Sequence, residues 1–373
     1  MRFLVLFLVV VTTTNVVSAF SLSKSSSSSQ FQEQKVQLSN GITGTITKGI
    51  PSPPSSPNPF ADVFNQNKKK EKPVLLFLHG SFHGSWCWEE YFMPFFVEKG
   101  YPVVAFNWRG TSGTPTGNPD IKKVKVSEHI NDLQCLLDTL PEIVGSNVSG
   151  SNANIKPILL SHSFGGIIVM KYLEELYTKN KTGNLDYNDL FSGFITMCSV
   201  PPSGNGKLTL RYLQRSLIDS YKITAGFAMK KCITDKKLCR DLFFGGSSSE
   251  DNDSSGISDD DIERYQTNFK LDSDDATIDL IDLGKQLPSF QCTKDGIAPF
   301  INAQDGDGTT FPPTLVVGAK DDFIVDEQAV VETATYFDSG KPAVVDSPHD
   351  VMLGSTWKNT ATIILEFIEN KIL

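Results

Sequence analysis

The sequence of 373 residues has little cysteine and no long apolar run, and each shortage excludes a class of protein. Its six cysteines stand mostly singly within apolar stretches, which is not the pattern of a disulfide framework, and none belongs to a Cys/His cluster with zinc-ligand spacing. We therefore expect neither a metal nor a cofactor. No stretch of about eighteen apolar residues is present, so no membrane-spanning helix is predicted. Only Cys232 and Cys239 are close enough in sequence to raise the question of a pair, which stays open.

Basic residues are outnumbered as well: 34 lysines and arginines stand against 43 aspartates and glutamates, for a net charge of −9 at pH 7. Nucleic acids and anionic membranes attract basic surfaces, so this balance argues against both as partners. The length allows one large α/β domain with an insertion, or two domains. The oligomeric state is left open by the sequence.

The first residues have the composition of a targeting segment. Arg2 precedes an apolar run, and Ala19 provides a small residue for cleavage, so residues 1–19 are predicted to be a secretory signal peptide. Residues 20–34 begin with Phe20 and are rich in serine, which is typical of a transit or disordered segment. Together the two segments resemble the bipartite plastid-targeting leaders of diatoms and related algae. The resemblance implies a plastid location, with secretion or the endomembrane system as the alternative.

From residue 35 onwards the chain is predicted to fold. Residues 36–48 alternate apolar and polar side chains around Asn40 and two glycines, which indicates a hairpin. Continuous apolar strands then alternate with helical spacing, which indicates an α/β fold with a mostly parallel central sheet and helices on both faces. The expected strands are residues 73–78, 101–106, 158–160, 194–198, 314–318 and 343–345, and the expected helices are residues 86–99, 126–140, 164–178, 326–337 and 356–371.

A helical cap insertion is expected over residues 201–300, because the alternation stops at two prolines and resumes only at Thr314. It divides the core into a first part, 35–200, and a second part, 301–373. Within the insertion, helical spacing covers residues 208–230 and 259–271, and an acidic, serine-rich run over residues 247–261 is interpreted as a solvated loop. The apolar cap side chains expected to form a roof are Leu208, Tyr212, Leu213, Phe227, Phe243 and Phe244.

A serine stands at the centre of the most informative motif. Residues 161–166 read Ser-His-Ser-Phe-Gly-Gly and lie between two apolar runs, which predicts a strand, a very tight turn and a helix with Ser163 at the apex. This is the nucleophile-elbow arrangement G-x-S-x-G, in which Ser161 replaces the first glycine and Gly165 supplies the last. The turn needs small residues at both places, so the replacement keeps the pattern.

Serine is a weak nucleophile unless a base takes its proton and an acid orients that base. After an elbow serine the acid comes next in the chain and the histidine last. Of the five histidines, only His349 lies downstream of Ser163 at a strand exit. The acid should follow the preceding strand, where Asp321 and Asp322 are adjacent. We favour Asp322, because a Phe-Ile-Val run follows it.

Acyl transfer also needs N–H donors for the oxyanion, and each is worth about 3 kcal/mol in the transition state. The turn supplies the backbone N–H of Phe164, at a helix N-terminus. The second donor should come from the loop after the first core strand, where we choose Ser81. His79 and His83 of that loop are expected to brace it by hydrogen bonds, because both precede the serine in the chain.

Four motifs together resemble the α/β-hydrolase superfamily: residues 76–88, 161–166, 318–322 and 347–353. The nearest resemblance is to the branch with a helical cap, which includes plant and algal plastid members. It covers about residues 35–372 and implies a serine hydrolase acting on carboxylic esters, with Ser163, Asp322 and His349 as the triad. The first motif also resembles plant hydroxynitrile lyases and methyl esterases, which have a shorter cap.

Three functions follow from these patterns. The first is an esterase or lipase-like hydrolase with a small-molecule ester substrate, for which the apolar cap slightly favours a lipid-like acyl group. The second is a hydroxynitrile-lyase-like lyase on the same triad, which needs a basic residue in the pocket. The third is a non-catalytic ligand-binding protein with a hydrolase fold. The presence of all three triad residues argues for catalysis.

Overall fold

The computed structural model describes residues 30–52, 72–117, 123–145, 155–180, 185–245, 257–273, 278–302 and 311–373. The predicted signal peptide, residues 20–29 of the serine-rich segment and most of the acidic run lie outside the described residues. The plastid location therefore stays a prediction. Among the described residues, no helix combines the length and the apolar character needed to cross a bilayer.

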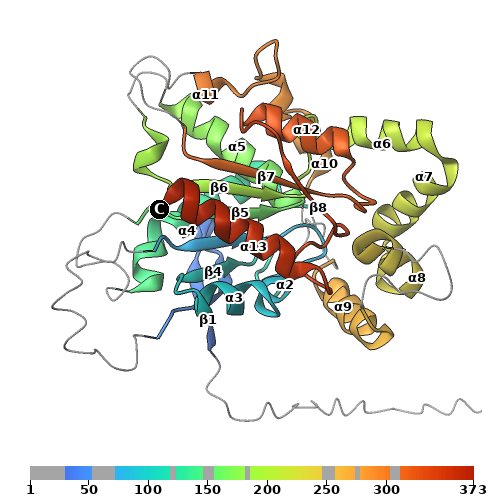
Figure 1. The fold of residues 1–373 in the computed structure, drawn as a ribbon, viewed down its shortest axis with the longest axis horizontal. Coiled ribbons are helices and arrows are strands. Elements are labelled where there is room, and N and C mark those ends of the chain that lie inside the picture. Colours follow the sequence, from blue (N-terminus) through green and yellow to red (C-terminus); the bar gives the residue numbers. More distant parts are fainter. Residues whose placement is uncertain are drawn as a thin grey trace, which may run out of the picture. The chain divides into compact units, whose positions relative to one another are not determined.

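An eight-stranded sheet forms the centre of the fold, in the order β1-β2-β4-β3-β5-β6-β7-β8 (Figure 1). The first two strands run antiparallel, and the six from β3 to β8 are parallel. This confirms the predicted α/β fold with a mostly parallel sheet. The strands are β1 Phe31–Gln37, β2 Thr43–Gly49, β3 Leu75–Leu78, β4 Val103–Phe106, β5 Ile158–His162, β6 Gly193–Met197, β7 Thr314–Ala319 and β8 Ala343–Val345.

The first strand corrects one boundary from the sequence. The sequence predicts a transit or disordered segment through residue 34, but residues 31–34 form the first half of β1, with Phe31 opposite Gly49 in the antiparallel register. The serine run ends at Ser29, and the Phe-Gln-Glu-Gln sequence that follows suits an edge strand that is exposed over most of its length.

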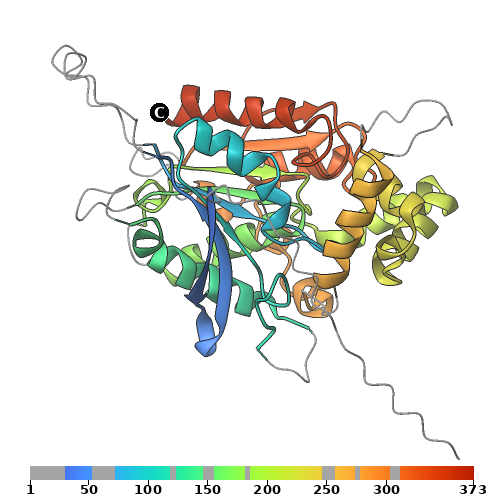
Figure 2. The same ribbon diagram turned by 90° about the horizontal axis from the view of Figure 1, so that it is seen from below.

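Helices cover both faces of the sheet, because neighbouring strand residues point in opposite directions. In β3, Leu76 and Leu78 pack towards α4 and α5, whereas Leu75 and Phe77 pack towards α3 and α13. Figure 2 shows α4 on one side of the sheet and α3 with α13 on the other. The core helices are α2 Trp86–Glu89, α3 Phe92–Glu98, α4 Val126–Val144, α5 Phe164–Lys179, α12 Glu327–Tyr336 and α13 Trp357–Phe367.

Two expected helices are each divided in the structure. The helix predicted over residues 86–99 breaks at Tyr91, whose backbone is not helical and whose ring stacks on Trp357 at a centroid distance of 5.0 Å. The helical pattern over residues 208–230 breaks at Ser216, which is extended and whose hydroxyl accepts a hydrogen bond from the N–H of Asp219 at 3.2 Å. A serine at this position caps a new helix.

The described residues between β6 and β7 form helices and loops and contribute no strand to the sheet. We call the described residues of 201–300 the cap. Figure 1 shows α6, α7 and α8 to one side of the sheet, with α9 below them. The helices of this segment are α6 Gly204–Arg215, α7 Leu217–Ile223, α8 Lys236–Cys239, α9 Asp259–Leu271, α10 Leu280–Gly284 and α11 Pro299–Asn302.

All six cysteines are free thiols, including the two whose pairing the sequence left open. Cys232 and Cys239 are both buried in the cap. Burial raises the pKa of both thiols, that of Cys232 to about 12. Thiols held in the protonated form are unreactive, so these cysteines serve as small apolar side chains.

Candidate active site

Ser163 occupies a strained turn between β5 and α5. Its backbone lies at φ 50° and ψ −117°, a conformation that residues other than glycine rarely adopt. The turn is held by hydrogen bonds from the Ser163 N–H to the Met197 carbonyl at 3.0 Å and from the Val200 N–H to the Ser163 carbonyl at 3.0 Å. These bonds anchor the serine to the end of β6, as expected for a nucleophile elbow.

Two glycines allow α5 to start this close to the sheet. A Cβ atom on Gly165 would lie 2.7 Å from the Leu78 carbonyl oxygen, and one on Gly166 would lie 2.0 Å from the Ser199 Oγ. Backbone atoms of β3 cannot move aside, so the first position accepts only glycine. The Gly-Gly pair after the serine is therefore required by packing.

The structure places His349 beside Asp322, at the carboxyl ends of β8 and β7. Both Asp322 carboxylate oxygens lie 2.9 Å from His349 Nδ1, and both side chains are buried. The Asp322 carboxylate is held in turn by the N–H groups of Ile324 and Val325, each at 2.8 Å from Oδ1. The neighbouring Asp321 is exposed and makes no side-chain contact with His349 among the described residues.

His162 connects the serine turn to His349. Its Nε2–H donates to the His349 carbonyl at 3.0 Å, and the two rings lie 4.7 Å apart. Within the described part of the chain, Ser163 Oγ makes no hydrogen bond to the His349 imidazole. Nucleophile–base hydrogen bonds are often long without substrate and tighten when it binds. The three predicted triad residues are thus gathered at one edge of the sheet, with the acid–base pair assembled.

Opposing effects set the proton affinity of His349. Burial lowers the pKa of this histidine, but the charge and hydrogen bond of Asp322 and the charge of Asp350 outweigh burial. The net pKa of His349 therefore lies above its ordinary value of 6.5. A base of raised pKa accepts a proton from serine more readily, and a buried carboxylate stabilises the imidazolium that forms.

The predicted oxyanion donors lie next to the serine. The N–H of Phe164 is the first of α5 and has no partner within the helix. The loop that carries Ser81 passes very close to the serine, because a Cβ atom on Gly80 would lie 3.3 Å from Ser163 Oγ. The Ser81 N–H makes no hydrogen bond to any described residue. Among the described residues, both N–H groups are therefore left without an acceptor, as an oxyanion hole requires.

His79 braces its loop, as the sequence predicted. It accepts a hydrogen bond from the Trp108 N–H at Nε2, 3.3 Å away, and donates from Nδ1 to the Gly80 carbonyl at 2.8 Å. This arrangement uses both ring nitrogens of a neutral imidazole, and burial lowers the pKa of His79 to about 3. His79 is therefore structural.

His83 braces the loop too, but it also reaches a carboxylate that the sequence analysis did not select. Its Nδ1 lies 2.7 Å from the Ser81 carbonyl oxygen, and its Nε2 lies 3.0 Å from Asp350 Oδ2. The backbone N–H of Asp350 donates to the Phe243 carbonyl of the cap at 3.0 Å. Asp350 thus joins the oxyanion loop, the His349 loop and the cap at one buried point, which we call the Asp350 junction.

Two further groups near the triad were missed from the sequence. His162 occupies one of the two variable positions of the G-x-S-x-G motif, and Cys198 stands alone at the end of an apolar run, so neither carries a local signal of its place beside the triad. The Cys198 sulfur lies within 4.8 Å of ligand-type atoms of Asp322 and His349. Burial, strengthened by the charge of Asp322, raises the pKa of Cys198 well above its usual range. It is a neutral neighbour of the acid–base pair.

Among the described residues, two groups of three side chains have atoms close enough to hold a metal ion: His162 with His349 and Asp350, and Cys198 with Asp322 and His349. Both groups share His349, whose Nδ1 is already bonded to Asp322. We assign both to the histidine–carboxylate network.

Stability at acidic pH should depend on the neutral histidines. Burial, together with the nearby histidines, lowers the pKa of His162 well below 6.5, as burial does for His79. Below the ordinary value the unfolded chain binds a proton at each position and the folded chain does not. Stability is therefore complete above 6.5 and is lost as the pH falls, by about 1.4 kcal/mol per pH unit per histidine. We expect His162→Gln to reduce this slope by one histidine's share, measured by urea unfolding between pH 7 and pH 5. An unchanged slope would show that His162 protonates in the folded protein.

Aromatic side chains of the cap and the oxyanion loop lie over the site. The Phe243 ring is 6.2 Å from the His349 ring and 4.8 Å from Phe269, and Phe82 lies 5.4 Å from Phe227. Of the expected roof, Phe227 and Phe243 belong to this cluster. The other four lie elsewhere. Phe244 stacks on Tyr265, and Leu213 is exposed on α6. Leu208 and Tyr212 belong to the hydrophobic core on the α4 and α5 side of the sheet.

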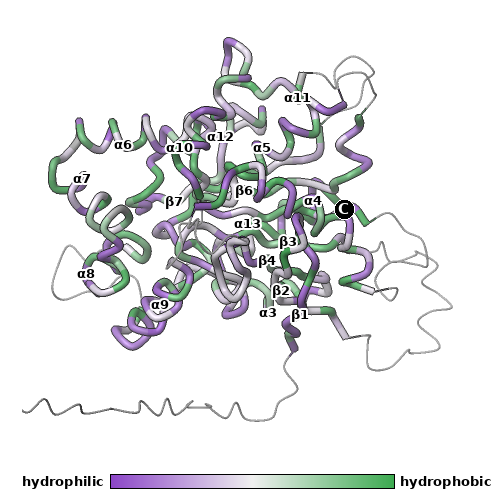
Figure 3. The backbone as a smooth tube through the Cα atoms, turned by 180° about the vertical axis from the view of Figure 1, so that it is seen from behind, coloured by the Kyte–Doolittle hydropathy of each residue, from purple (hydrophilic) through white to green (hydrophobic). Residues whose placement is uncertain are grey.

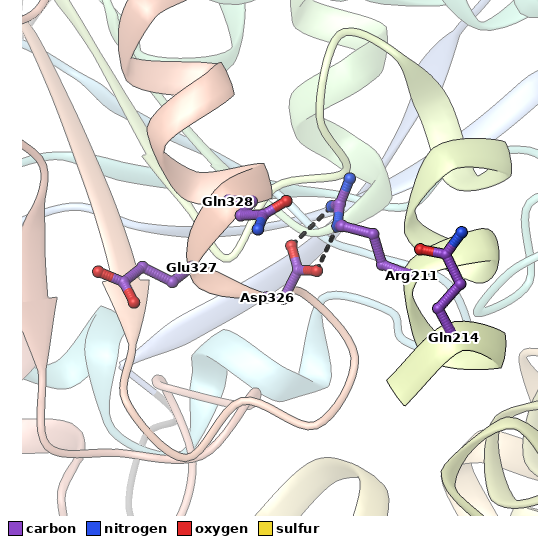
Figure 4. Close-up of a pocket in the computed structure, with 5 residues that line it drawn as sticks. All are labelled: Arg211, Gln214, Asp326, Glu327 and Gln328. Atoms are coloured by element: carbon purple, nitrogen blue, oxygen red, sulfur yellow. Dashed lines mark hydrogen bonds and ion pairs between the residues drawn. The ribbon is translucent and has the colours of Figure 1, made fainter. Parts of the chain in front are cut away.

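A pocket of ≈ 440 Å³ lies at the seam between α6 and α12 (Figure 4). The Arg211 guanidinium crosses the seam and binds both carboxylate oxygens of Asp326, at 2.5 and 2.6 Å. Its other lining residues are Gln214, Glu327 and Gln328. None of these belongs to the triad or to the oxyanion loop, so this pocket marks a cap–core contact.

Comparisons with known proteins place the fold and the family of the chain. Methylesterase 10 of Arabidopsis thaliana is 32% identical over 110 residues, which are 29% of this chain and 34% of that protein. The chain therefore matches about a third of the length of this curated relative. An esterase from Thermogutta terrifontis has 16% identity and a TM-score of 0.54, over 92% of this chain and 100% of that one. An epoxide hydrolase from Vigna radiata has 16% identity and a TM-score of 0.54, over 92% and 99%.

These solved structures share the fold, and their identities are too low to transfer an activity. A model described as the alpha/beta hydrolase family matches residues 75–355, which is more than half of the chain and includes the serine turn, the acid and the histidine. With the mostly parallel sheet and the elbow already described, the protein belongs to the alpha/beta hydrolase family.

Proposed function

We propose that the protein is a serine hydrolase that cleaves carboxylic esters through an acyl-enzyme intermediate. The observation that carries the proposal is the buried His349–Asp322 pair at the same sheet edge as an elbow serine. Each of the three groups needs the other two: the acid orients the base, the base takes the serine proton, and the strained turn presents the hydroxyl. The partial sequence match to a methylesterase supports this reaction class.

The reaction would begin when Ser163 Oγ attacks the ester carbonyl carbon and its proton passes to His349 Nε2. The N–H groups of Ser81 and Phe164 would stabilise the oxyanion. Collapse of this intermediate breaks the carbon–oxygen bond, and the alcohol leaves with the proton from His349. A water molecule then attacks the acyl-serine in the same way, which releases the acid and restores the Ser163 hydroxyl.

The substrate would carry an apolar acyl group, because Phe243, Phe82 and Phe227 form an aromatic roof next to the reacting atoms. The lyase alternative needs a basic residue in the pocket. In the described part of the chain, none of the side chains bonded to or stacked against His349 is a lysine or an arginine. No observation therefore favours the lyase.

Labelling with a fluorophosphonate, followed by ester turnover, tests the proposal. The full-length protein should be labelled at one serine and should release acid from aryl esters, and Ser163→Ala should lose both properties while it remains folded. Ser161→Ala is the matched control, since it removes a neighbouring hydroxyl and should keep the label. A folded wild type that neither takes up the label nor releases acid from esters of any acyl length would favour the ligand-binding alternative.

A further inference from the structure

Exposed apolar side chains gather on the first two cap helices and at the end of the turn that follows them. Six of the thirteen large apolar side chains that are exposed among the described residues fall between positions 210 and 229. Leu217 and Ile218, at the start of α7, are 79% and 70% exposed. The six are Leu210, Leu213, Leu217, Ile218, Tyr221 and Met229. Figure 3 shows hydrophobic stretches along α7 at the edge of the cap. We call these six residues the cap patch.

Positive charge is concentrated on the same segment. Residues 204–240 contain nine lysines and arginines but only two aspartates, a local net charge of +7 in a chain of −9. The rest of the chain therefore carries −16. Lys207, Lys231 and Lys237 are exposed and make no ion pair within the described part of the chain. The overall balance, which argued against an anionic surface as a partner, hides a local charge of the opposite sign.

Apolar residues beside unpaired lysines suit one kind of surface. A short helix with exposed leucine, isoleucine and tyrosine inserts its apolar side at the level of the lipid headgroups, and neighbouring lysines bind anionic headgroups. We propose that α6 and α7 dock the protein on an anionic lipid bilayer, with the cap patch inserted and the three lysines on the headgroups.

This docking would bring the bilayer close to the proposed site. The π-helical turn Thr224–Ala228 continues directly from α7. It carries Phe227, whose ring lies 5.4 Å from Phe82 of the oxyanion loop and 5.7 Å from Phe243. One continuous stretch of chain therefore runs from the exposed patch to the aromatic roof. A lipid-like ester in the bilayer would then lie close to the site. Its role as the substrate rests on the proposed function, whereas the docking does not.

Vesicle co-sedimentation tests the docking without catalysis. The full-length Ser163→Ala chain is mixed with vesicles of phosphatidylcholine and phosphatidylglycerol in equal parts, and with phosphatidylcholine alone. We expect tight binding only to the anionic vesicles, weakened by salt. Each of the changes K207Q, K231Q and K237Q should lower the partition coefficient about fivefold, and the double change L217S/I218S should lower it at least about tenfold.

Matched variants separate the cap from the rest of the chain. The triple change K341Q/K358Q/K371Q removes three charges from exposed core lysines, as K207Q, K231Q and K237Q combined remove three from the cap. The double change V331S/V344S removes two exposed apolar side chains from the core. Both should leave binding unchanged, and the N-terminal residues 1–34 are the same in every variant.

Equal losses in core and cap variants would overturn the proposal, as would equal binding to vesicles with and without anionic lipid. Conversion from dimer to monomer by L217S/I218S in sedimentation velocity would instead assign the patch to a second copy. Fluorophosphonate labelling of the wild-type chain, which retains Ser163, tests the proposed function independently of vesicle binding.

Discussion

Asp322→Asn should reduce ester turnover about ten-thousandfold with little change in folding. The amide that replaces the carboxylate carries no negative charge. His349 therefore loses both the charged acceptor that orients its Nδ1–H and the group that stabilises the imidazolium. The acid limb of kcat/KM should also move. Activity requires neutral His349 and is lost as the pH falls through its pKa, which lies above 6.5 in the wild type. Without the Asp322 charge the opposing effect of burial dominates, and the limb should shift to lower pH.

Asp321→Asn is the matched control for this experiment. It changes the adjacent carboxylate, which is exposed and whose backbone N–H bonds to the Ser347 carbonyl at 3.1 Å. We expect turnover within about twofold of the wild type, since an exposed charge beyond contact range is well screened. A large loss in Asp321→Asn with near-normal turnover in Asp322→Asn would reverse the assignment of the acid.

His83→Phe should lower the free energy of unfolding by about 3–5 kcal/mol, because it leaves the buried Asp350 carboxylate without its partner. Phenylalanine keeps the aromatic packing, since the His83 ring stacks on Trp86 at 5.3 Å and meets Phe269 edge-on at 4.9 Å. The change therefore isolates the two hydrogen bonds to Ser81 and Asp350. Urea unfolding at neutral pH measures the effect.

A double-mutant cycle identifies the origin of that loss. In an Asp350→Asn background no charge remains to be stranded, so His83→Phe should cost about 1–3 kcal/mol, the usual penalty for an unpaired neutral group. Equal costs in the two backgrounds would show that the histidine acts through packing alone. Turnover should fall as well in His83→Phe, because the Ser81 carbonyl loses the bond that holds the oxyanion loop in place.

The parts of the site that the sequence predicted are those with local signals. Ser163 lies in a strand–turn–helix motif in which contact with β3 requires glycine at position 165. With five histidines in the chain, the position of His349 in chain order could be reasoned by elimination. The sheet was predictable for the same reason, since each buried strand is a continuous apolar run. Asp321 and Asp322 remained alternatives because their order along the chain does not reveal which side chain turns inward.

What sequence reasoning missed depends on contacts between distant segments. The His83–Asp350 bond joins residues from opposite ends of the core, and nothing near either residue signals the other. The break between α6 and α7 did have a local signal, the Ser216–Asp219 cap, but apolar spacing continues across it and favoured one helix. The positive charge of residues 204–240 was obscured because the acidic residues of the rest of the chain outweigh it in the total.

The Asp350–Phe243 hydrogen bond has a consequence for anyone who exchanges caps between hydrolases of this family. The donor belongs to the peptide next to His349, and the acceptor is a main-chain oxygen. Any residue at position 243 offers the same acceptor, so alignment of sequences would assign no constraint to the contact. A transplanted cap succeeds only if its backbone returns to this point, and a graft chosen by side chains alone would leave the histidine loop without its support.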